Sequence, residues 1–282
     1  MPLVTVLLAA HDDASFLGEA IDSILGQTLS DLELIVVDDA STDETAGVLG
    51  AIDDKRVRVF RNEGQAGLAA SLNRGLEHAE GRYVARLDAD DVALPQRLER
   101  QVDRLRAEPR CAVVGSAIVD LDESGRVGTT HVLPAGARPL RWHSLFSSPF
   151  FHPTVVVDRE VLDTHGLRYD PEYLESEDYD LWTRLFTFAD GANLTAPLVR
   201  KRVHAGQASV RRSDVQESFQ RRIALREIGR VAPGVDADGA WRVGARKGGG
   251  SRRQFVALLR AFERRYGRDW NVRKAALKAL VG

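Results

Sequence analysis

The stretch Tyr83-Val84-Ala85-Arg86-Leu87-Asp88-Ala89-Asp90-Asp91 decides the fold of this chain. It begins as a largely apolar, strand-forming run and continues directly into three carboxylates within four residues. The same order occurs upstream, where the apolar run at 32–37 ends in Asp38 and Asp39. Ligands of open parallel sheets bind at the carboxyl ends of the strands, so both groups of carboxylates stand where a site is expected.

Working outward, strand and helix patterns alternate along the first half of the chain. The runs at 3–8 and 57–60 predict two further strands. A helix is predicted over 16–25, where apolar residues recur every three or four positions, and another from Ala66 to Glu80. Regular alternation indicates crossover units, so the predicted fold class is α/β, with a mostly parallel sheet flanked by helices.

The second half of the chain is less regular. Gly and Pro interrupt the pattern from 116 to 174, helical patterns follow, and a Gly-rich break at 248–250 precedes a basic C-terminal segment. The expected parts are a main domain at 1–230, made of halves at 1–115 and 116–230, and a helical extension at 231–282.

Composition excludes several classes of protein. The chain has 282 residues, of which 44% are hydrophobic and 28% charged, which excludes disordered, collagen-like and coiled-coil proteins. No apolar run reaches the roughly 18 residues that span a bilayer, and the N-terminus shows no basic leader of a signal peptide. The single cysteine, Cys111, fits a reducing compartment. We therefore expect a cytoplasmic protein.

The net charge of −2 is the sum of unlike parts. The segment 241–282 holds 12 Lys and Arg against 2 acidic residues, a balance of +10, so the first 240 residues carry −12. Phe255, Leu258, Leu259, Phe262 and Tyr266 share one face of a predicted helix in this basic segment. That face predicts docking on the main domain or a subunit interface in a homo-oligomer, and contact with anionic membrane lipids is the alternative.

Three groups of carboxylates are candidates for chemistry. Asp88, Asp90 and Asp91 repel one another unless a cation compensates, and hard oxygen ligands suit Mg²⁺ or Mn²⁺. An acidic surface turn is the alternative. A strand-end carboxylate such as Asp39 can accept hydrogen bonds from a base or a ribose. Asp178 comes just before a helix, where helix capping is the alternative to catalysis.

Taken together, these residues resemble family 2 glycosyltransferases, which have the GT-A fold. The resemblance covers about residues 3–210 and implies a Rossmann-like sheet and an inverting enzyme that uses nucleotide sugars. The matching segments, in chain order, are Ala9-Ala10-His11-Asp12, 20–28, 33–43, Asn62-Glu63-Gly64, Leu72-Asn73-Arg74-Gly75, 79–83, 87–91 with Pro95, Glu177-Asp178 and Arg202-Val203-His204.

The resemblance also implies roles for individual residues. Asp178 would be the general base that takes the proton of the acceptor hydroxyl. The implied metal ligands, for Mn²⁺ or Mg²⁺, are Asp90, Asp88 and His204. The implied donor-binding residues, for a nucleotide-diphosphate sugar with UDP as the commonest nucleotide, are Ala9, His11, Asp38, Asp39, Asn73, Asp88 and Ala89. The implied acceptor-site residues are His152, Glu177 and Trp182, although the helical spacing of Trp182 with Leu185 favours core packing.

Differences from the family pattern indicate which type of glycosyltransferase to expect. Polymerising members carry Gln-x-x-Arg-Trp and membrane helices, whereas here Arg138 stands where the Gln of Arg141-Trp142 is needed. A single-sugar transferase is therefore expected, acting on a glycan or lipid-linked acceptor in surface polysaccharide or glycoconjugate synthesis. With a lipid-linked acceptor it would work at the inner face of the cell membrane.

Other classes fit less well. An oxidoreductase with a dinucleotide cofactor needs Gly-x-Gly-x-x-Gly after the first strand, and the sequence has Ala9-Ala10-His11-Asp12-Asp13-Ala14. A nucleotidyltransferase of sugar phosphates needs a Gly-rich, basic loop at the same place. A non-catalytic scaffold has no use for the carboxylates. We expect no nucleic-acid partner, because no recognition motif accompanies the basic charge.

Overall fold

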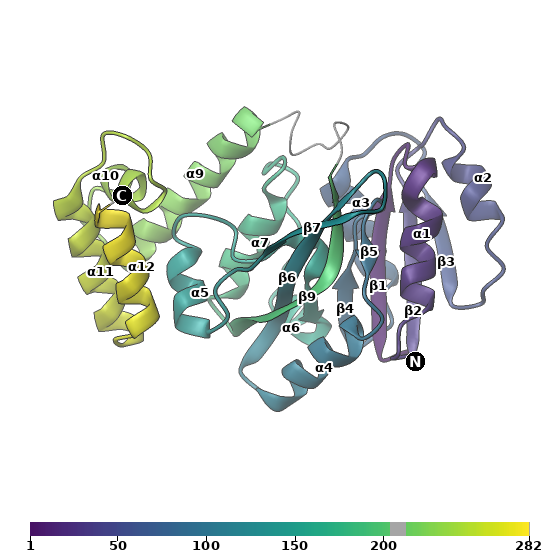
Figure 1. Ribbon diagram of the computed structural model, residues 1–282, viewed down its shortest axis with the longest axis horizontal. Coiled ribbons are helices and arrows are strands. Elements are labelled where there is room, and N and C mark those ends of the chain that lie inside the picture. The colour runs from purple at the N-terminus through teal and green to yellow at the C-terminus, as the bar shows by residue number, and fades with distance from the viewer. Residues whose placement is uncertain (204–212, 282) are drawn as a thin grey trace.

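A mixed sheet forms the centre of the computed structural model, which describes residues 1–203 and 213–281 (Figure 1). Within these residues the sheet has nine strands in the order β3-β2-β1-β4-β8-β6-β9-β5, with β7 paired to β6. The strands are β1 (Val4–Ala10), β2 (Leu32–Asp38), β3 (Val57–Arg61), β4 (Tyr83–Arg86), β5 (Val92–Ala93), β6 (Cys111–Asp122), β7 (Val127–His131), β8 (Val156–Asp158) and β9 (Asp190–Val203).

The direction of the strands follows the sequence pattern. The four strands β3, β2, β1 and β4 are parallel, as is the pair β6 and β9. The strands β5, β7 and β8 run antiparallel to their neighbours, and β7 and β8 belong to the less regular second half. The predicted α/β class with a mostly parallel sheet is confirmed.

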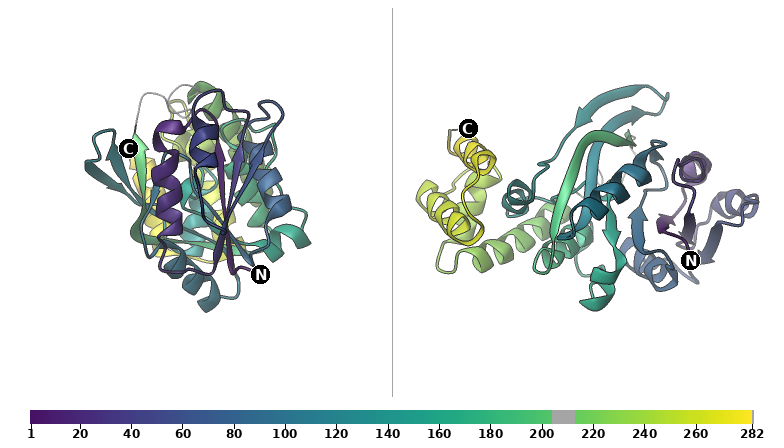
Figure 2. Two further views of the ribbon diagram at one scale, coloured as in Figure 1. Left: turned by 90° about the vertical axis from the view of Figure 1, so that its right-hand side faces the viewer. Right: turned by 90° about the horizontal axis from the view of Figure 1, so that it is seen from below.

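Helices cover both faces of this sheet (Figures 1 and 2). One buried cluster packs α1 and α4 against it, and a second packs α3, α6 and α7 against the other face. The helices of the described residues are α1 (Ala14–Leu25), α2 (Thr45–Gly50), α3 (Leu68–His78), α4 (Arg97–Ala107), α5 (Ala137–His143), η1 (His152–Thr154), α6 (Arg159–Thr164), α7 (Glu177–Leu185), α9 (Ser213–Val231), α10 (Ala237–Gly244), α11 (Arg252–Tyr266) and α12 (Trp270–Val281).

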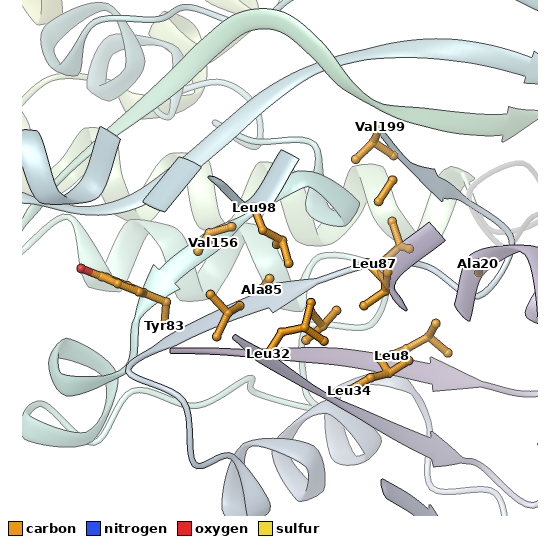
Figure 3. Close-up of a cluster of buried hydrophobic side chains, with 14 of the residues drawn as sticks. Leu8, Ala20, Leu32, Leu34, Tyr83, Ala85, Leu87, Leu98, Val156 and Val199 are labelled. Carbon is orange, nitrogen blue, oxygen red and sulfur yellow. The ribbon is translucent and has the colours of Figure 1, made fainter. Parts of the chain in front are cut away.

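The central strands are mostly apolar because both of their faces are buried. In β1, Val6 and Leu8 point into the first cluster and Leu7 into the second, and none is more than 3% exposed. Figure 3 shows part of the first cluster, where Leu8 and Leu34 of neighbouring strands lie with Leu98 of α4. Burial of each such side chain contributes about 1.5–3 kcal/mol, so the continuous apolar runs set the sheet.

Cys111, the first residue of β6, belongs to the first cluster. The residue is 7% exposed, and burial raises the pKa of its thiol to about 11. It therefore acts as a small apolar side chain in the core.

The C-terminal helices have their own core. A third buried cluster joins α9, α10, α11 and α12 to Trp142 of α5, whose ring lies edge-on to Phe255 and Phe262 at centroid distances of 5.6 and 5.2 Å. Phe255, Leu258 and Phe262 are fully buried, so the predicted apolar face of this helix docks within the chain. The interpretation of that face as a docking surface is confirmed, so these side chains are not available to lipid, and membrane contact by other parts of the basic segment stays a prediction.

Hydrogen bonds also hold α5, the helix on which the C-terminal helices pack, to the main domain. Arg141 of α5 donates to Phe186 O at 2.6 Å, to Ala189 O at 2.7 Å and to the Asp190 carboxylate at 2.8 Å. Because Asp190 begins β9, α5 is tied to the end of a sheet strand. None of the helices in 1–203 and 213–281 is long and apolar enough to cross a membrane.

Candidate active site

The carboxyl ends of β1, β2 and β4 meet at one edge of the sheet. The parallel register places Ala10 of β1 beside Asp38 of β2, and Leu7 of β1 beside Arg86 of β4. The pairing continues past the strands, since Asp39 N donates to Ala10 O at 2.8 Å. The loops that follow these three strands therefore begin side by side, as the strand-end carboxylates predict.

Asp39 organises the loop beyond β3. Its carboxylate accepts hydrogen bonds from Asn62 Nδ2 at 2.6 Å and from the main-chain N–H groups of Ala66 and Gly67 at 2.8 Å each. Burial raises the pKa of Asp39, but these hydrogen bonds outweigh it and lower the pKa overall. His11 Nδ1 lies 2.8 Å from Asp39 O, so the first two loops are joined at this point.

Asp38 is bound within the fold. It is 1% exposed, and its two oxygens accept from Ser41 N at 2.9 Å and from Arg61 Nη1 at 2.6 Å. Ala9, which pairs with Val37 in the register, is half-buried beneath the same edge. Asp38 thus fixes the turn from β2, and its predicted contact with a nucleoside stays a prediction.

The three carboxylates after β4 converge. One oxygen from each of Asp88, Asp90 and Asp91 lies within 4.8 Å of the other two, and Ala89 between them is buried. Asp91 is 1% exposed; its Oδ1 accepts from Arg202 N at 2.8 Å, and its Oδ2 has no partner among the described residues. Burial and the charges of Asp88 and Asp90 raise the pKa of Asp91 well above its usual value. The three carboxylates are hard oxygen ligands that repel one another, and one of their oxygens has no partner among the described residues. A cation such as Mn²⁺ or Mg²⁺ fits such a group.

Arg202 of β9 binds the acidic loop, which comprises residues 88–91. Its Nε donates to Asp90 O at 2.9 Å and its Nη2 to Glu19 Oε2 at 2.5 Å. The guanidinium also lies 4.4 Å from the ring centroid of Phe16, a cation–π contact. Arg202 thus connects α1 to the acidic loop. The predicted ligand His204 lies outside the described residues.

Asp13 is a site residue that the sequence reasoning missed. Its Oδ2 accepts from His11 N at 2.9 Å, and its pKa is raised to about 6 by burial and by the charges of Asp90 and Asp88. The negative charges of Asp88 and Asp90 therefore act on a fourth carboxylate, that of Asp13. The signal was present, because Asp13 comes three residues after the end of β1, much as Asp88 comes two residues after the end of β4.

Arg86 interacts with carboxylates from both halves of the chain. It is 4% exposed and pairs with Asp88, while its Nε and Nη1 have no hydrogen-bond partner among the described residues. Burial lowers the pKa of the Arg86 guanidinium. The negative charge of Asp88 raises it, and the pKa is higher overall than its usual value. Its charge also lowers the pKa values of Asp178 and Glu177, so one buried cation serves both groups of carboxylates.

Asp178 and Glu177 begin α7. Ser148 Oγ donates to Asp178 Oδ2 at 3.1 Å. Burial raises the pKa of Asp178 to about 6, and burial with the charge of Asp178 raises that of Glu177 to about 7. A half-buried carboxylate with a pKa of about 6 is suited to accept a proton near neutral pH.

His152 and Asn73 connect the two halves of the site through Tyr169. His152 Nε2 lies 3.1 Å from Tyr169 Oη, and burial lowers the pKa of His152 well below its usual value. The Asn73 side chain accepts from Tyr169 N at 2.9 Å and donates to Tyr169 O at 2.8 Å. Asn73 thereby ties α3 to the segment before α7.

Trp182 does not reach the surface of the site. It is 0% exposed and packs against Phe150, His152 and Tyr169 at centroid distances of 5.8, 6.3 and 6.4 Å. The prediction of a direct acceptor contact is therefore corrected to core packing beneath the site. The reason is its position on the inner face of α7, which the spacing with Leu185 indicates.

Relatives with known sequences identify the family of this chain. Residues 5–165 match Glycosyl transferase family 2. An uncharacterised glycosyltransferase of Haemophilus influenzae is 34% identical over 218 residues, which are 74% of this chain and 68% of that protein. WfaP of Escherichia coli, a UDP-Glc:alpha-D-GlcNAc-diphosphoundecaprenol beta-1,3-glucosyltransferase, is 28% identical over 81% of this chain and 88% of its own length.

Solved structures share the fold. TarS 1-349 of S. aureus, in complex with UDP-GlcNAc, has a TM-score of 0.63 at 17% identity and covers 100% of this chain and 92% of its own. The mannosyltransferase PcManGT of Pyrobaculum calidifontis, in complex with GDP-Man and Mn²⁺, has a TM-score of 0.59 at 21% identity and covers 99% and 74%. With the family match over more than half of its length, the chain belongs to glycosyl transferase family 2 and is a glycosyltransferase.

Proposed function

We propose that this glycosyltransferase moves one sugar from a nucleotide-diphosphate sugar to an acceptor hydroxyl and inverts the anomeric carbon. One observation supports this most strongly. Arg86, a buried cation, pairs with Asp88 of the acidic loop, and its charge also lowers the pKa of the half-buried Asp178. This shared cation supports a donor phosphate site and a proton acceptor that act in the same reaction.

The proposed step is a single displacement. The acceptor oxygen forms a bond to the anomeric carbon while the bond from that carbon to the diphosphate oxygen breaks. The acceptor proton passes to Asp178, whose Oδ2 is held by Ser148 and whose pKa of about 6 leaves it ionised at neutral pH. One displacement inverts the configuration and needs no second nucleophile.

We assign a divalent cation, Mn²⁺ or Mg²⁺, to the acidic loop. Asp90 and Asp88 would hold it, and the buried Asp91 would orient the loop through its bond to Arg202 N. When bound, the cation stabilises the negative charge that develops on the departing diphosphate. Arg86, which neutralises Asp88 in this structure, has two further N–H groups that can bind a phosphate oxygen.

The donor site is assigned to the loops after β1 and β2. Ala9, His11, Asp38 and Asp39 line the sheet edge there, and Asn73 lies on the adjacent α3. A UDP-sugar is the first candidate, because WfaP is named for UDP-Glc and a structural neighbour binds UDP-GlcNAc. GDP-mannose is the second, since PcManGT binds it with Mn²⁺.

A melting experiment tests the donor assignment. UDP-glucose, UDP-GlcNAc and GDP-mannose are each added with and without Mn²⁺, and the expected result is a higher melting temperature with one of them, only when Mn²⁺ is present. A ligand at 100 times its Kd adds about 2.7 kcal/mol to stability. The absence of a shift with every donor would contradict the donor site. Release of UDP or GDP then separates an enzyme from a scaffold that only binds sugar nucleotides.

We further propose that the acceptor is a glycan or lipid-linked precursor in surface polysaccharide or glycoconjugate synthesis, reached at the inner face of the membrane. The structural feature that supports a membrane contact is the helix α12. Its Trp270, Leu277 and Val281 are 75%, 62% and 78% exposed and share one helix face with Lys274. An apolar stripe beside basic residues suits the surface of an anionic bilayer.

Liposome co-sedimentation tests this membrane contact. Binding is expected to require anionic lipid and to fall at least tenfold in the double variant Trp270→Ser and Leu277→Ser. The matched control is Val127→Ser, which removes an exposed apolar side chain from β7 at the other side of the molecule. Equal binding by the double variant and the native protein would contradict a role for α12.

A further inference from the structure

A pocket of about 670 Å³ lies between the C-terminal helices and the main domain. Its walls come from α5 with the turn after it and from α9, α10, α11 and α12, and they are mostly apolar, with Trp142, Phe146, Trp241 and Phe255 among the lining residues. Pockets of this size enclose small molecules with a largely apolar surface. Figure 1 shows α5 and α12, two of these elements, as neighbours.

The pocket adjoins the assigned general base. Ser147 lines it, and the next residue, Ser148, donates to Asp178 Oδ2 at 3.1 Å. On the opposite wall Gln216 lines the pocket and donates through Nε2 to Glu175 O at 3.0 Å, two residues before Glu177. Because consecutive Cα atoms are about 3.8 Å apart, the pocket starts within one or two residues of the reacting group.

The lining also carries basic side chains. Arg246, Lys247 and Lys278 line the pocket and are exposed, and Lys247 pairs with Glu217 at 2.8 Å. Arg246 and Lys278 have no carboxylate partner in the part of the chain that the structure describes, so they are available to an anionic group. An apolar cavity with cations among its lining residues is complementary to a molecule that joins an apolar chain to a phosphate.

We propose that this pocket binds the apolar chain of a lipid-linked acceptor, with the phosphate that joins chain and sugar held near Arg246 and Lys278. The sugar then extends past Ser147 toward Asp178. The inference rests on the proposed function for its reaction, but the binding of the chain does not depend on transfer. It assigns acceptor recognition to the helical extension, whereas the donor is assigned to the sheet edge.

Direct binding is the first test. Dodecyl phosphate is titrated into the full chain in a calorimeter, with inorganic phosphate as the comparison. We expect saturable binding of dodecyl phosphate only, and at least tenfold weaker binding by Ala279→Trp and Ala275→Phe, which fill the pocket from α12. Arg260→Trp, on the exposed surface of α11 and away from the pocket, should bind like the native protein. Equal affinity of the native protein and both pocket variants, with melting temperatures unchanged, would overturn the proposal.

Transfer is the second test. Two acceptors share the same sugar diphosphate and carry either a dodecyl chain or a methyl group. The expected kcat/KM is at least tenfold higher for the dodecyl acceptor, and Ala279→Trp removes this preference while transfer to the methyl acceptor stays within twofold. Lys278→Glu should raise KM for both acceptors, whereas the matched charge reversal Arg264→Glu should not.

The two tests separate the two proposals. Transfer without any preference for the longer chain overturns the pocket assignment and leaves the proposed function in place. Binding of dodecyl phosphate that the pocket variants lose, in a protein that transfers no sugar from any nucleotide donor, supports the pocket and contradicts the proposed function.

Discussion

Replacing Asp178 by Asn is expected to lower kcat by about 10²–10⁴-fold and to leave the binding of the donor unchanged. The asparagine keeps the size of the side chain and can still accept from Ser148, but it cannot take the acceptor proton. Turnover and the donor-dependent melting shift are measured on the same preparation. Glu172→Gln is the matched control, because Glu172 is an exposed carboxylate of the same segment, six residues earlier.

The same assignment fixes the response to pH. The pKa of Asp178 is raised to about 6, so the carboxylate gains its proton as the pH falls through 6 and can no longer act as the base. The kcat/KM of the native enzyme is therefore expected to fall below about pH 6. If Asp178→Asn had the rate of the native enzyme, Asp178 would not be the base. The same fall of kcat/KM at acid pH in both proteins would also contradict this role.

Replacing Asp90 by Ala is expected to reduce transfer below detection and to weaken the binding of Mn²⁺ by on the order of 100-fold or more. The change leaves Asp88, which already pairs with Arg86, and Asp91, which accepts from Arg202 N. The variant thus has two carboxylates for the cation where the native loop has three, and one of the two is already neutralised by Arg86. The binding of Mn²⁺ is measured by electron paramagnetic resonance, in the presence of the donor and without acceptor.

The control for this variant is Asp103→Ala, which removes an exposed carboxylate from α4 and should bind Mn²⁺ like the native protein. Because the readout is the bound ion, the result is independent of the acceptor and of the rate. Wild-type affinity for Mn²⁺ in Asp90→Ala would exclude Asp90 as a ligand.

The first half of the fold could be predicted because its signals are local. The strands β1, β2, β3 and β4 are mainly apolar runs, and a helix pattern follows each of the first three. The second half could not, because its strands depend on partners that are distant in sequence. β9 (Asp190–Val203) contains Pro197 and the charged run Arg200-Lys201-Arg202, and it pairs with β6 with register shifts that no local pattern indicates.

The site divides in the same way. The acidic loop and Asp178 follow from strand-end and helix-start positions, which a sequence displays. The ion pair of Arg86 with Asp88 and the electrostatic effect of the acidic loop on Asp13 depend on how the loops meet. The helical spacing of Trp182 and the apolar face of α11 predict that both are covered, and the fold shows by which residues: Phe150 and Tyr169 for the first and Trp142 for the second.

Cys111 has a practical consequence. A thiol with a pKa of about 11 that is 7% exposed stays protonated and does not react with maleimides at neutral pH, since the thiolate is the nucleophile. It is the only cysteine of the chain, so any cysteine placed on the surface becomes a unique attachment point. Leu277→Cys on the outer face of α12 would thus accept a single dye in the otherwise native protein, and its emission would report the polarity around that helix.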